Sequence, residues 1–202
     1  MRRPGKIVCV GRNYREHAKE LGHEVPNEPL LFLKPPSSVI SSGERIVLPR
    51  ASRRVDFEGE IGVVIGATLR HAGADHARSA IAAIVALNDV TARDLQRSDG
   101  QWTRAKGFDT FCPLGPPVPV PGSLDELTVI TRINGAERQR GSASEMVFPI
   151  PELLAYISQV MTLEEGDVVA TGTPAGVGPL VIGDVVEVEV GGSGVKNLVV
   201  SE

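Results

Sequence analysis

Short β-branched segments joined by Gly-containing turns make up the end of the chain, at residues 167–171, 185–190 and 195–200. Branched side chains pack well on a pleated sheet, so these segments are expected to be strands. Gly (22) and Pro (15) are frequent among the 202 residues, whereas the aromatic residues are one Trp, two Tyr and five Phe. This pattern requires many turns and predicts a β-rich or mixed fold rather than a helix bundle.

Other strands are expected at residues 6–10, 30–33, 46–48, 55–65 and 127–133. The four consecutive apolar residues at 30–33 favour a buried strand. Asn134-Gly135 directly follows the last of these segments and is the strongest hairpin signal in the chain.

Helices are expected at four places. Asn13 is the expected N-cap of a helix at residues 14–21 that ends at Gly22, and a second capping box starts at Thr91. Residues 97–123 are expected to be irregular.

Two longer segments carry apolar residues at helical spacing. Residues 74–87 are Ala-rich, and their last part fits a buried strand as an alternative. Pro151 suits the first turn of a helix. The apolar side of that helix would comprise Leu153, Leu154, Ile157 and Val160.

Length and charge narrow the function classes. A chain of 202 residues, 42% of them hydrophobic and 23% charged, is expected to form one compact domain over residues 1–202. The net charge of −4 and the interspersed charges argue against a nucleic-acid partner. No apolar stretch is long enough to span a membrane, and no signal peptide is evident. Two cysteines are too few for a disulfide framework, so a cytoplasmic location is expected.

Three carboxylates are candidate metal ligands. Glu58 and Glu60, two residues apart on an expected strand, would point to the same face. Asp89 follows an apolar run that resembles core. Three carboxylates converging in a cleft suit a hard divalent cation such as Mg²⁺ or Mn²⁺. The alternative is that both glutamates lie on the solvent face of an edge strand.

Two helical patterns could carry chemistry. Asp89, Arg93 and Gln96 have the spacing of one helix face, on which Arg93 could hold a substrate carboxylate. The alternative is a surface ion pair. His17 and Glu20 are three residues apart, and a carboxylate beside an imidazole builds a base that can activate water. The alternative is a surface His–Glu pair.

Further candidates lie in loops. Lys106 near a metal site could stabilise negative charge, or it could be a solvated lysine. The Gly-rich turn that begins Thr171-Gly172-Thr173 lacks the Gly-Lys-Ser/Thr ending of a nucleotide-binding phosphate loop. Its hydroxyl and N–H groups could still bind a carboxylate. Arg12 and Asn13 could do the same at a helix start, or Asn13 could be a helix cap only.

Taken in order, these segments resemble the fumarylacetoacetate hydrolase family. Each motif is weak alone, but the ordered set spans nearly the whole chain. The matching stretches are Val10-Gly11-Arg12-Asn13-Tyr14 with His17 and Glu20, Phe32-Leu33-Lys34-Pro35, Asp56-Phe57-Glu58-Gly59-Glu60, Asn88 to Gln96, Ala105-Lys106-Gly107-Phe108-Asp109, and Thr171 to Val177. The chain length is similar to the short, single-domain branch that acts on acylpyruvates.

The resemblance implies a mixed α+β, β-rich fold, a β-roll or sandwich with a few short helices, and a homodimer. It implies Mg²⁺ or Mn²⁺ on three carboxylates and a small 2-oxo acid as substrate. It makes His17 and Glu20 a water-activating dyad. The implied ligands are Glu58, Glu60 and Asp89, and the residues implied around the substrate are Arg93, Gln96, Lys106 and Thr171.

The expected activity is hydrolysis of the C3–C4 bond of acylpyruvates to pyruvate and a carboxylic acid. His17, oriented by Glu20, would take a proton from the water that attacks C4, and Lys106 and Gln96 would stabilise the oxyanion. Oxaloacetate decarboxylation and the isomerisation or decarboxylation of dienedioates in aromatic degradation are alternatives. A carboxylate-binding module without catalysis and a metal-free structural domain are alternatives of a different class.

Overall fold

Two five-stranded sheets form the framework of the computed structural model, which describes residues 3–20, 22 and 25–202. The first sheet has the order β2-β1-β12-β6-β7, in which only β1 and β12 pair in parallel. Its strands are β1 (Ile7–Gly11), β2 (Leu30–Lys34), β6 (Gly59–Ile65), β7 (Ile81–Asn88) and β12 (Val168–Ala170).

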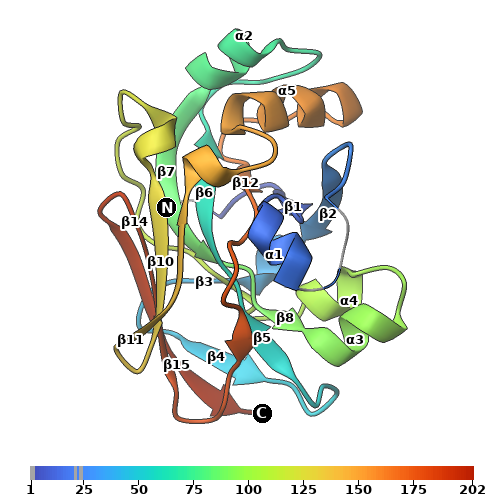
Figure 1. Ribbon diagram of the computed structural model, residues 1–202, viewed down its shortest axis with the longest axis vertical. Coiled ribbons are helices and arrows are strands. Elements are labelled where there is room, and N and C mark those ends of the chain that lie inside the picture. The colour runs from blue at the N-terminus through green and yellow to red at the C-terminus, as the bar shows by residue number, and fades with distance from the viewer. Residues whose placement is uncertain (1–2, 21, 23–24) are drawn as a thin grey trace.

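The second sheet has the order β11-β10-β14-β15-β4, with β15 and β4 parallel. Its strands are β4 (Arg45–Leu48), β10 (Thr128–Ile133), β11 (Ala136–Ser142), β14 (Val185–Val190) and β15 (Ser193–Ser201). Strands β6 and β7 pack against β10, β14 and β15, so the two sheets form a sandwich (Figure 1).

Shorter pairings lie at the edges of this sandwich. One small sheet comprises β13 (Gly178–Pro179), β5 (Val55–Phe57) and β8 (Thr91–Ala92), and another pairs β3 (Val39–Ile40) with β9 (Cys112–Pro113). Short 3-10 helices occupy Pro36–Ser38, Leu124–Glu126 and Ala143–Glu145.

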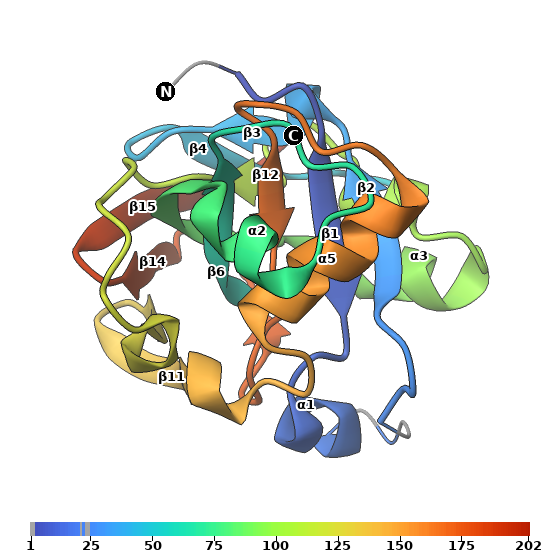
Figure 2. The same cartoon turned by 90° about the horizontal axis from the view of Figure 1, so that it is seen from above.

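The α-helices are short and lie outside the sheets. They are α1 (Arg15–Glu20), α2 (Ala74–Ser79), α3 (Arg93–Ser98), α4 (Thr103–Lys106) and α5 (Ile150–Val160). Helices α2 and α5 pack together at one end of the molecule, whereas α3 and α4 form a separate pair (Figures 1 and 2). Among the described residues, no helix has the length and apolar character needed to cross a bilayer.

The largest core cluster joins α5 to the first sheet. Leu153, Leu154 and Ile157 of α5 are fully buried with Val8 of β1 and Ile61 of β6. The structure therefore confirms a mixed, strand-rich α+β fold.

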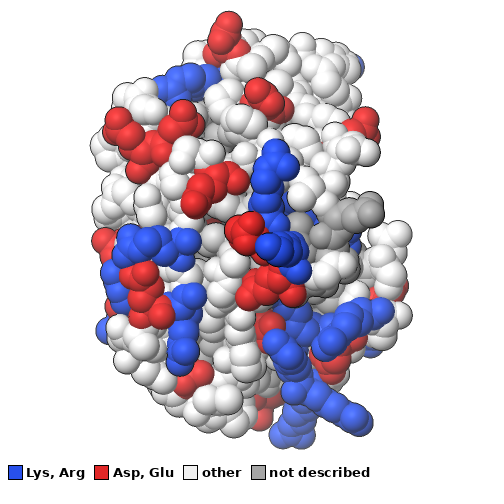
Figure 3. Space-filling model, in the orientation of Figure 1, with Lys and Arg blue, Asp and Glu red and all other residues white. Residues whose placement is uncertain are grey.

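Lys and Arg are interspersed with Asp and Glu on the face seen in Figure 3.

Most expected elements are present. For residues 74–87, the alternative of a buried strand in the last part of the segment is correct. Residues 74–87 are not one helix, because α2 ends at Ser79 and the remainder forms β7. A β-carbon at Gly62 would lie 2.5 Å from Val85 Cγ2, so β6 and β7 approach closely at this pair. Cross-strand packing thus outweighs the helical propensity of the alanines.

Three local predictions are wrong. Residues 55–65 form two strands, β5 and β6, separated at Glu58. The segment at 30–33 is not buried, because β2 is an edge strand in which Leu30 and Leu33 are 37% and 47% exposed. Val160, the last residue of α5, is likewise exposed.

Both expected capping boxes are also wrong. The Asn13 amide bonds Phe148 and the Thr171 carbonyl instead of capping α1. The Thr91 hydroxyl donates to the Asp89 carbonyl, and α3 begins only at Arg93. The segment expected to be irregular contains the end of α3, α4 and β9.

Two turn predictions hold. Asn134 and Gly135 have φ values of 52° and 81° in the hairpin between β10 and β11, as a tight primed turn requires. Gly22 has φ of 70° and its N–H donates to the Lys19 carbonyl, as expected where a helix ends. Leu21 lies outside the described residues.

Candidate active site

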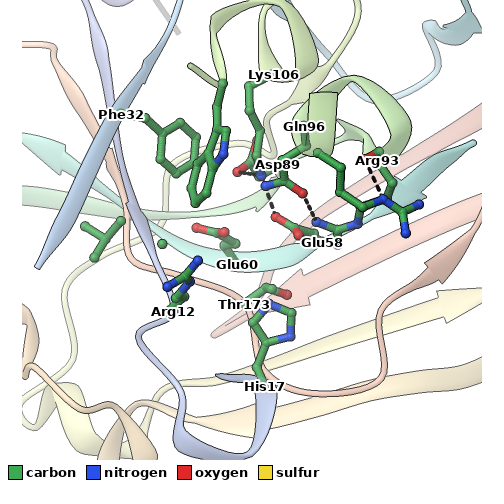
Figure 4. A pocket seen from close by; sticks show the side chains of 14 residues that line it. Arg12, His17, Phe32, Glu58, Glu60, Asp89, Arg93, Gln96, Lys106 and Thr173 are labelled. Carbon is green, nitrogen blue, oxygen red and sulfur yellow. Dashed lines mark hydrogen bonds and ion pairs between the residues drawn. The ribbon is translucent and has the colours of Figure 1, made fainter. Parts of the chain in front are cut away.

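A cavity of about 300 Å³ opens where β1, α1, β6, the end of β7, α3 and α4 meet. The predicted residues that line it are Arg12, His17, Glu58, Glu60, Asp89, Arg93, Gln96, Lys106 and Thr173. In Figure 4, Arg12, His17 and Thr173 lie on one side of the carboxylates, and Arg93, Gln96 and Lys106 lie on the other. The fold thus brings together residues from five separate segments of the sequence.

Strand register assembles the three carboxylates. Glu58 lies between β5 and β6, Glu60 lies on β6, and Asp89 directly follows β7. The Asp89 N–H donates to the Glu58 carbonyl at 2.8 Å, and the Glu58 N–H donates to Asn88 Oδ1 at 3.0 Å. One oxygen from each of the three buried carboxylates lies within 4.8 Å of the others.

Three buried cations contact two of these carboxylates. Lys106 Nζ lies 2.7 Å from Glu58 Oε2 and 2.6 Å from Asp89 Oδ2. Lys34 Nζ lies 2.6 Å from Asp89 Oδ1, and Arg93 Nη2 lies 2.5 Å from Glu58 Oε1. Glu58 and Asp89 are therefore charge-compensated within the protein.

Glu60 lacks such compensation. Its Oε2 accepts the Gly172 N–H at 2.8 Å, but no Lys or Arg of the described residues lies within ion-pair distance. Burial, followed by repulsion from Asp89 and Glu58, raises the pKa of Glu60 well above its ordinary value. The cluster is short of positive charge at this carboxylate.

The opposite shift applies to Glu58. Burial alone would raise its pKa, but the positive charges of Arg93 and Lys106 lower that pKa far below the ordinary range. Burial likewise opposes the charge on Lys106, and the carboxylates of Asp89 and Glu58 overcome it and raise the pKa of Lys106. Lys106 is therefore a fixed cation at neutral pH.

The three carboxylates fit a divalent cation. Their donor set is oxygen only, as hard cations such as Mg²⁺ and Mn²⁺ prefer. A carboxylate oxygen has two lone pairs, so the ion pairs of Glu58 and Asp89 leave acceptor capacity. A cation among the three would also supply the positive charge that Glu60 lacks.

His17 and Glu20 are brought together as their spacing predicts. His17 Nδ1 lies 3.3 Å from Glu20 Oε2, and His17 is 4% exposed in the cavity wall. Burial lowers the pKa of His17 against the opposing effects of Glu58 and Glu20. At neutral pH the imidazole is uncharged, and a proton on Nδ1 facing Glu20 leaves Nε2 as a base.

Arg93 and Gln96 lie together on α3, but Asp89 does not share their helix. Asp89 precedes β8 and α3 begins at Arg93, so the prediction of one helix face through all three is wrong. Arg93 Nη1 donates to Gln96 Oε1 at 2.9 Å, and Arg93 Nε donates to Asp56 Oδ2 at 3.0 Å. Asp56 therefore holds the guanidinium beside the cavity.

Asn13, Thr171, Gly172 and Glu20 do not line the cavity. The Asn13 amide donates to the Thr171 carbonyl at 2.8 Å, and the Thr171 hydroxyl donates to the Ile61 carbonyl at 2.9 Å. These groups tie the segment after β12 to β6. In the same segment the Gly172 N–H donates to Glu60 Oε2, so this backbone also holds one carboxylate of the cluster.

Thr173 does reach the cavity, and it is held by a residue that the sequence did not single out. Its hydroxyl donates to the Gly59 carbonyl at 2.9 Å and accepts from Gln139 Nε2 at 2.7 Å. Gln139 Oε1 also accepts the Gly59 N–H at 2.9 Å. No local pattern in the sequence marked this glutamine.

Sequence reasoning also missed a lysine and an aromatic wall. Lys34 is fully buried; it lies in the stretch Phe32-Leu33-Lys34-Pro35 that carries the family resemblance, but no role was expected for it. Phe32 and Trp102 line the cavity with ring centroids 5.2 Å apart, in an edge-on arrangement. Lys106 Nζ lies 4.9 Å from the Phe32 ring centroid, so this wall also faces the buried cation.

Comparisons with known proteins place the whole fold in one family. The model of the fumarylacetoacetate (FAA) hydrolase C-terminal family matches residues 6–200. An oxaloacetate tautomerase of Escherichia coli is 44% identical over 186 residues, which cover 89% of this chain and 85% of the relative. A 2,4-didehydro-3-deoxy-L-rhamnonate hydrolase of a Sphingomonas species is 40% identical over 210 residues, covering 98% and 74%.

Solved structures match over nearly the whole chain. The crystal structure of a 2-hydroxyhepta-2,4-diene-1,7-dioate isomerase from Mycobacterium marinum has a TM-score of 0.91 at 41% identity. The match covers 99% of this chain and 76% of that chain. Similar proteins thus include a hydrolase, an isomerase and a tautomerase.

Proposed function

The chain belongs to the fumarylacetoacetate hydrolase family, and on that premise we propose that it hydrolyses the C3–C4 bond of acylpyruvates. The products would be pyruvate and a carboxylic acid, and the reaction would require Mg²⁺ or Mn²⁺ at Glu58, Glu60 and Asp89.

The observation that carries this proposal is the His17–Glu20 pair beside the carboxylate cluster. Isomerisation and tautomerisation move a proton of the substrate itself, whereas hydrolysis needs a base that activates water. The buried, uncharged imidazole of His17 supplies such a base, and Glu20 fixes its tautomer.

When bound, the cation would act as a Lewis acid toward the 2-oxo acid group. His17 Nε2 takes a proton from water as the water oxygen forms a bond to C4. Lys106 and Gln96 stabilise the negative charge on the C4 oxygen. The C3–C4 bond then breaks, which releases the carboxylic acid and leaves the electron pair on C3. The proton held by His17 Nε2 passes to C3 and gives pyruvate.

A second candidate is the keto–enol tautomerisation of oxaloacetate. It is favoured by the 44% identity to the E. coli oxaloacetate tautomerase, which extends over 89% of this chain. In this reaction His17 would transfer a proton between C3 and the C2 oxygen, and no water would be consumed.

One assay separates the two candidates. Protein stripped with a chelator is incubated with acetylpyruvate or oxaloacetate, with and without Mg²⁺, while pyruvate and the ultraviolet absorbance of the oxaloacetate enol are followed. Mg²⁺-dependent pyruvate from acetylpyruvate supports the hydrolase. Faster loss of the enol without pyruvate supports the tautomerase, and pyruvate from oxaloacetate alone indicates a decarboxylase.

A further inference from the structure

Gln139 is a buried side chain among exposed neighbours, and the proposed mechanism gives it no role. It lies on β11, the outer strand of the second sheet, and is 1% exposed, whereas Glu137, Arg138 and Arg140 beside it face solvent. Burial of a side-chain amide costs free energy unless the amide finds hydrogen-bond partners. The partners of Gln139 therefore indicate what this residue does.

A β-bulge directs Gln139 inward. Gln139 pairs with Thr131 across the hairpin, but the next pair joins Glu137 to Arg132. Arg138 is therefore an extra residue on β11. Without it the register would shift by one residue, and Gln139 would point to the opposite face of the sheet. Bulges re-aim side chains and are frequent beside active sites, and this one brings an amide of the second sheet to the backbone beside the carboxylate cluster.

The contacts of Gln139 fix the orientation of its amide. Oε1 accepts the Gly59 N–H, and Nε2 donates to the Pro174 carbonyl, both at 2.9 Å. A main-chain N–H only donates and a carbonyl only accepts, so the amide cannot be reversed. Nε2 also donates to Thr173 Oγ1 at 2.7 Å, and the Thr173 hydroxyl donates to the Gly59 carbonyl at 2.9 Å. These bonds close a ring around Gly59.

The ring holds both peptide groups that connect Glu58 to Glu60. The Gly59 N–H belongs to the peptide after Glu58, and the Gly59 carbonyl belongs to the peptide before Glu60. Glycine has the greatest backbone freedom, so an unrestrained Gly59 would let the two glutamates move relative to each other. A larger residue cannot supply the restraint, because a β-carbon at this position would overlap Thr131 Oγ1. The spacing of two candidate metal ligands thus depends on Gln139.

Ligand spacing affects which cation a carboxylate site prefers. Mg²⁺ requires nearly octahedral geometry with oxygens at about 2.0–2.1 Å, whereas Ca²⁺ accepts irregular geometry at about 2.3–2.6 Å. A restrained pair of glutamates therefore favours the smaller ion. Loss of the restraint should weaken Mg²⁺ binding more than Ca²⁺ binding.

We propose that Gln139 is a positioning residue that holds Glu58 and Glu60 at the spacing of a small divalent cation such as Mg²⁺, and that it thereby sets the preference of the site over Ca²⁺. It acts through Thr173 and the two peptide groups of Gly59. The proposal rests on the metal site of the proposed function and not on hydrolysis itself.

Metal titrations test this role without substrate. Chelator-stripped protein is titrated with Mg²⁺ and with Ca²⁺ in a calorimeter, as the wild type and as Gln139→Met, whose side chain has a similar length but makes none of the three hydrogen bonds. The Mg²⁺ affinity should fall about tenfold or more, as is typical when a group that orients metal ligands is removed. The Ca²⁺ affinity should fall less, so the ratio of Mg²⁺ to Ca²⁺ affinity should fall at least about threefold.

Asn197→Leu is the matched control. Asn197 of β15 is also a buried amide, and its Nδ2 donates to the Ser41 and Glu44 carbonyls at 2.8 Å each, outside the cavity. This variant should lose stability as Gln139→Met does, yet keep the wild-type affinity ratio. Thr173→Val removes the hydroxyl that holds the Gly59 carbonyl, and it should shift the ratio in the same direction as Gln139→Met.

An unchanged ratio in folded Gln139→Met, an equal fall in affinity for both cations, or the same shift in Asn197→Leu would overturn the proposal. If Gln139→Met does not fold, an unchanged ratio in Thr173→Val overturns it. A wild-type protein without saturable Mg²⁺ binding would overturn it together with the metal site. Cleavage of acetylpyruvate is measured separately: if the ratio shifts as expected and no acetylpyruvate is cleaved, hydrolysis is wrong and the role of Gln139 is retained.

Discussion

The main-chain N–H of Gly176 donates to both carboxylate oxygens of Glu20, each at 3.2 Å. Four residues earlier, the N–H of Gly172 donates to Glu60. The segment after β12 thus holds one carboxylate of the metal cluster and the carboxylate that orients His17. The candidate base and the candidate metal site are positioned by the same short stretch of backbone.

Gly176→Ala should therefore impair the base. Gly176 has φ of 98°, and a β-carbon there would lie 2.2 Å from the Arg138 carbonyl oxygen, so this backbone must move and Glu20 must lose its contact. We expect kcat to fall roughly tenfold to hundredfold, as for a misplaced catalytic group.

Gly183→Ala is the matched control. Gly183 has a similar φ of 94°, but no atom lies within 4 Å of an added β-carbon. Both variants should lose about 1–3 kcal/mol of stability from backbone strain, and only Gly176→Ala should lose kcat. Equal kcat values in the two variants would show that the Gly176 contact has no role in catalysis.

The pH dependence of kcat should reflect the lowered pKa of His17. A general base works in its neutral form, so kcat rises with pH through the pKa and then stays level. Because burial lowers that pKa, the midpoint of the acid limb should lie below about 6.5, the ordinary value for histidine. An acid limb centred above this value would contradict the assignment.

Glu20→Gln should move that acid limb further down. Burial dominates the pKa of His17, and Glu20 opposes it, so the loss of the carboxylate lowers the pKa again and weakens the base. The plateau kcat should fall by about 10²-fold or more. His76→Gln, at an exposed histidine on α2, should change neither quantity.

Glu60→Gln should stabilise the metal-free protein and remove its response to Mg²⁺. The pKa of Glu60 is raised in the folded chain, so the metal-free protein loses stability as pH rises through that value. The neutral amide avoids this loss, and we expect a gain of about 1 kcal/mol or more at pH 7.

Urea unfolding in chelator and in Mg²⁺ measures both effects. Wild-type protein should gain about 2.7 kcal/mol at a Mg²⁺ concentration one hundred times Kd, whereas Glu60→Gln should gain little. Glu165→Gln, at an exposed position, should behave like the wild type. A wild-type protein without any gain from Mg²⁺ or Mn²⁺ would exclude the metal site.

Lys34→Met should be strongly destabilising. It leaves one oxygen of the buried Asp89 carboxylate without its cation, which typically costs about 3–5 kcal/mol. The double variant Lys34→Met/Asp89→Asn should recover part of this loss, because the unpaired charge is gone. Urea unfolding checks the cycle, and a loss under about 0.5 kcal/mol in Lys34→Met would refute a structural role.

Short-range patterns predicted the parts of the site that are local in sequence. The spacing of His17 and Glu20 predicted their contact on one helix. Glu58 and Glu60 were expected on one strand with a solvent-face alternative; both are buried in the cluster, although Glu58 lies between β5 and β6. The Asn134-Gly135 turn likewise needs φ values that its own residues favour.

The atomic contacts between segments distant in sequence could not be predicted from the sequence patterns. Asp89 joins the glutamates through the register of β6 against β7, and Lys34 reaches Asp89 from another strand. Asn13 bonds Phe148 rather than its own helix, because tertiary packing offers it better partners. The family resemblance grouped these segments, but only the fold shows which atoms meet.

The most direct test follows the fate of water. Acetylpyruvate is incubated with the protein and Mg²⁺ in oxygen-18-labelled water, and the acetate formed is examined by mass spectrometry. We predict that each acetate carries one oxygen from the solvent, and that its formation is lost with chelator and in His17→Ala. Enol–keto interconversion of the substrate without any acetate would contradict hydrolysis and leave the tautomerase as the function of this chain.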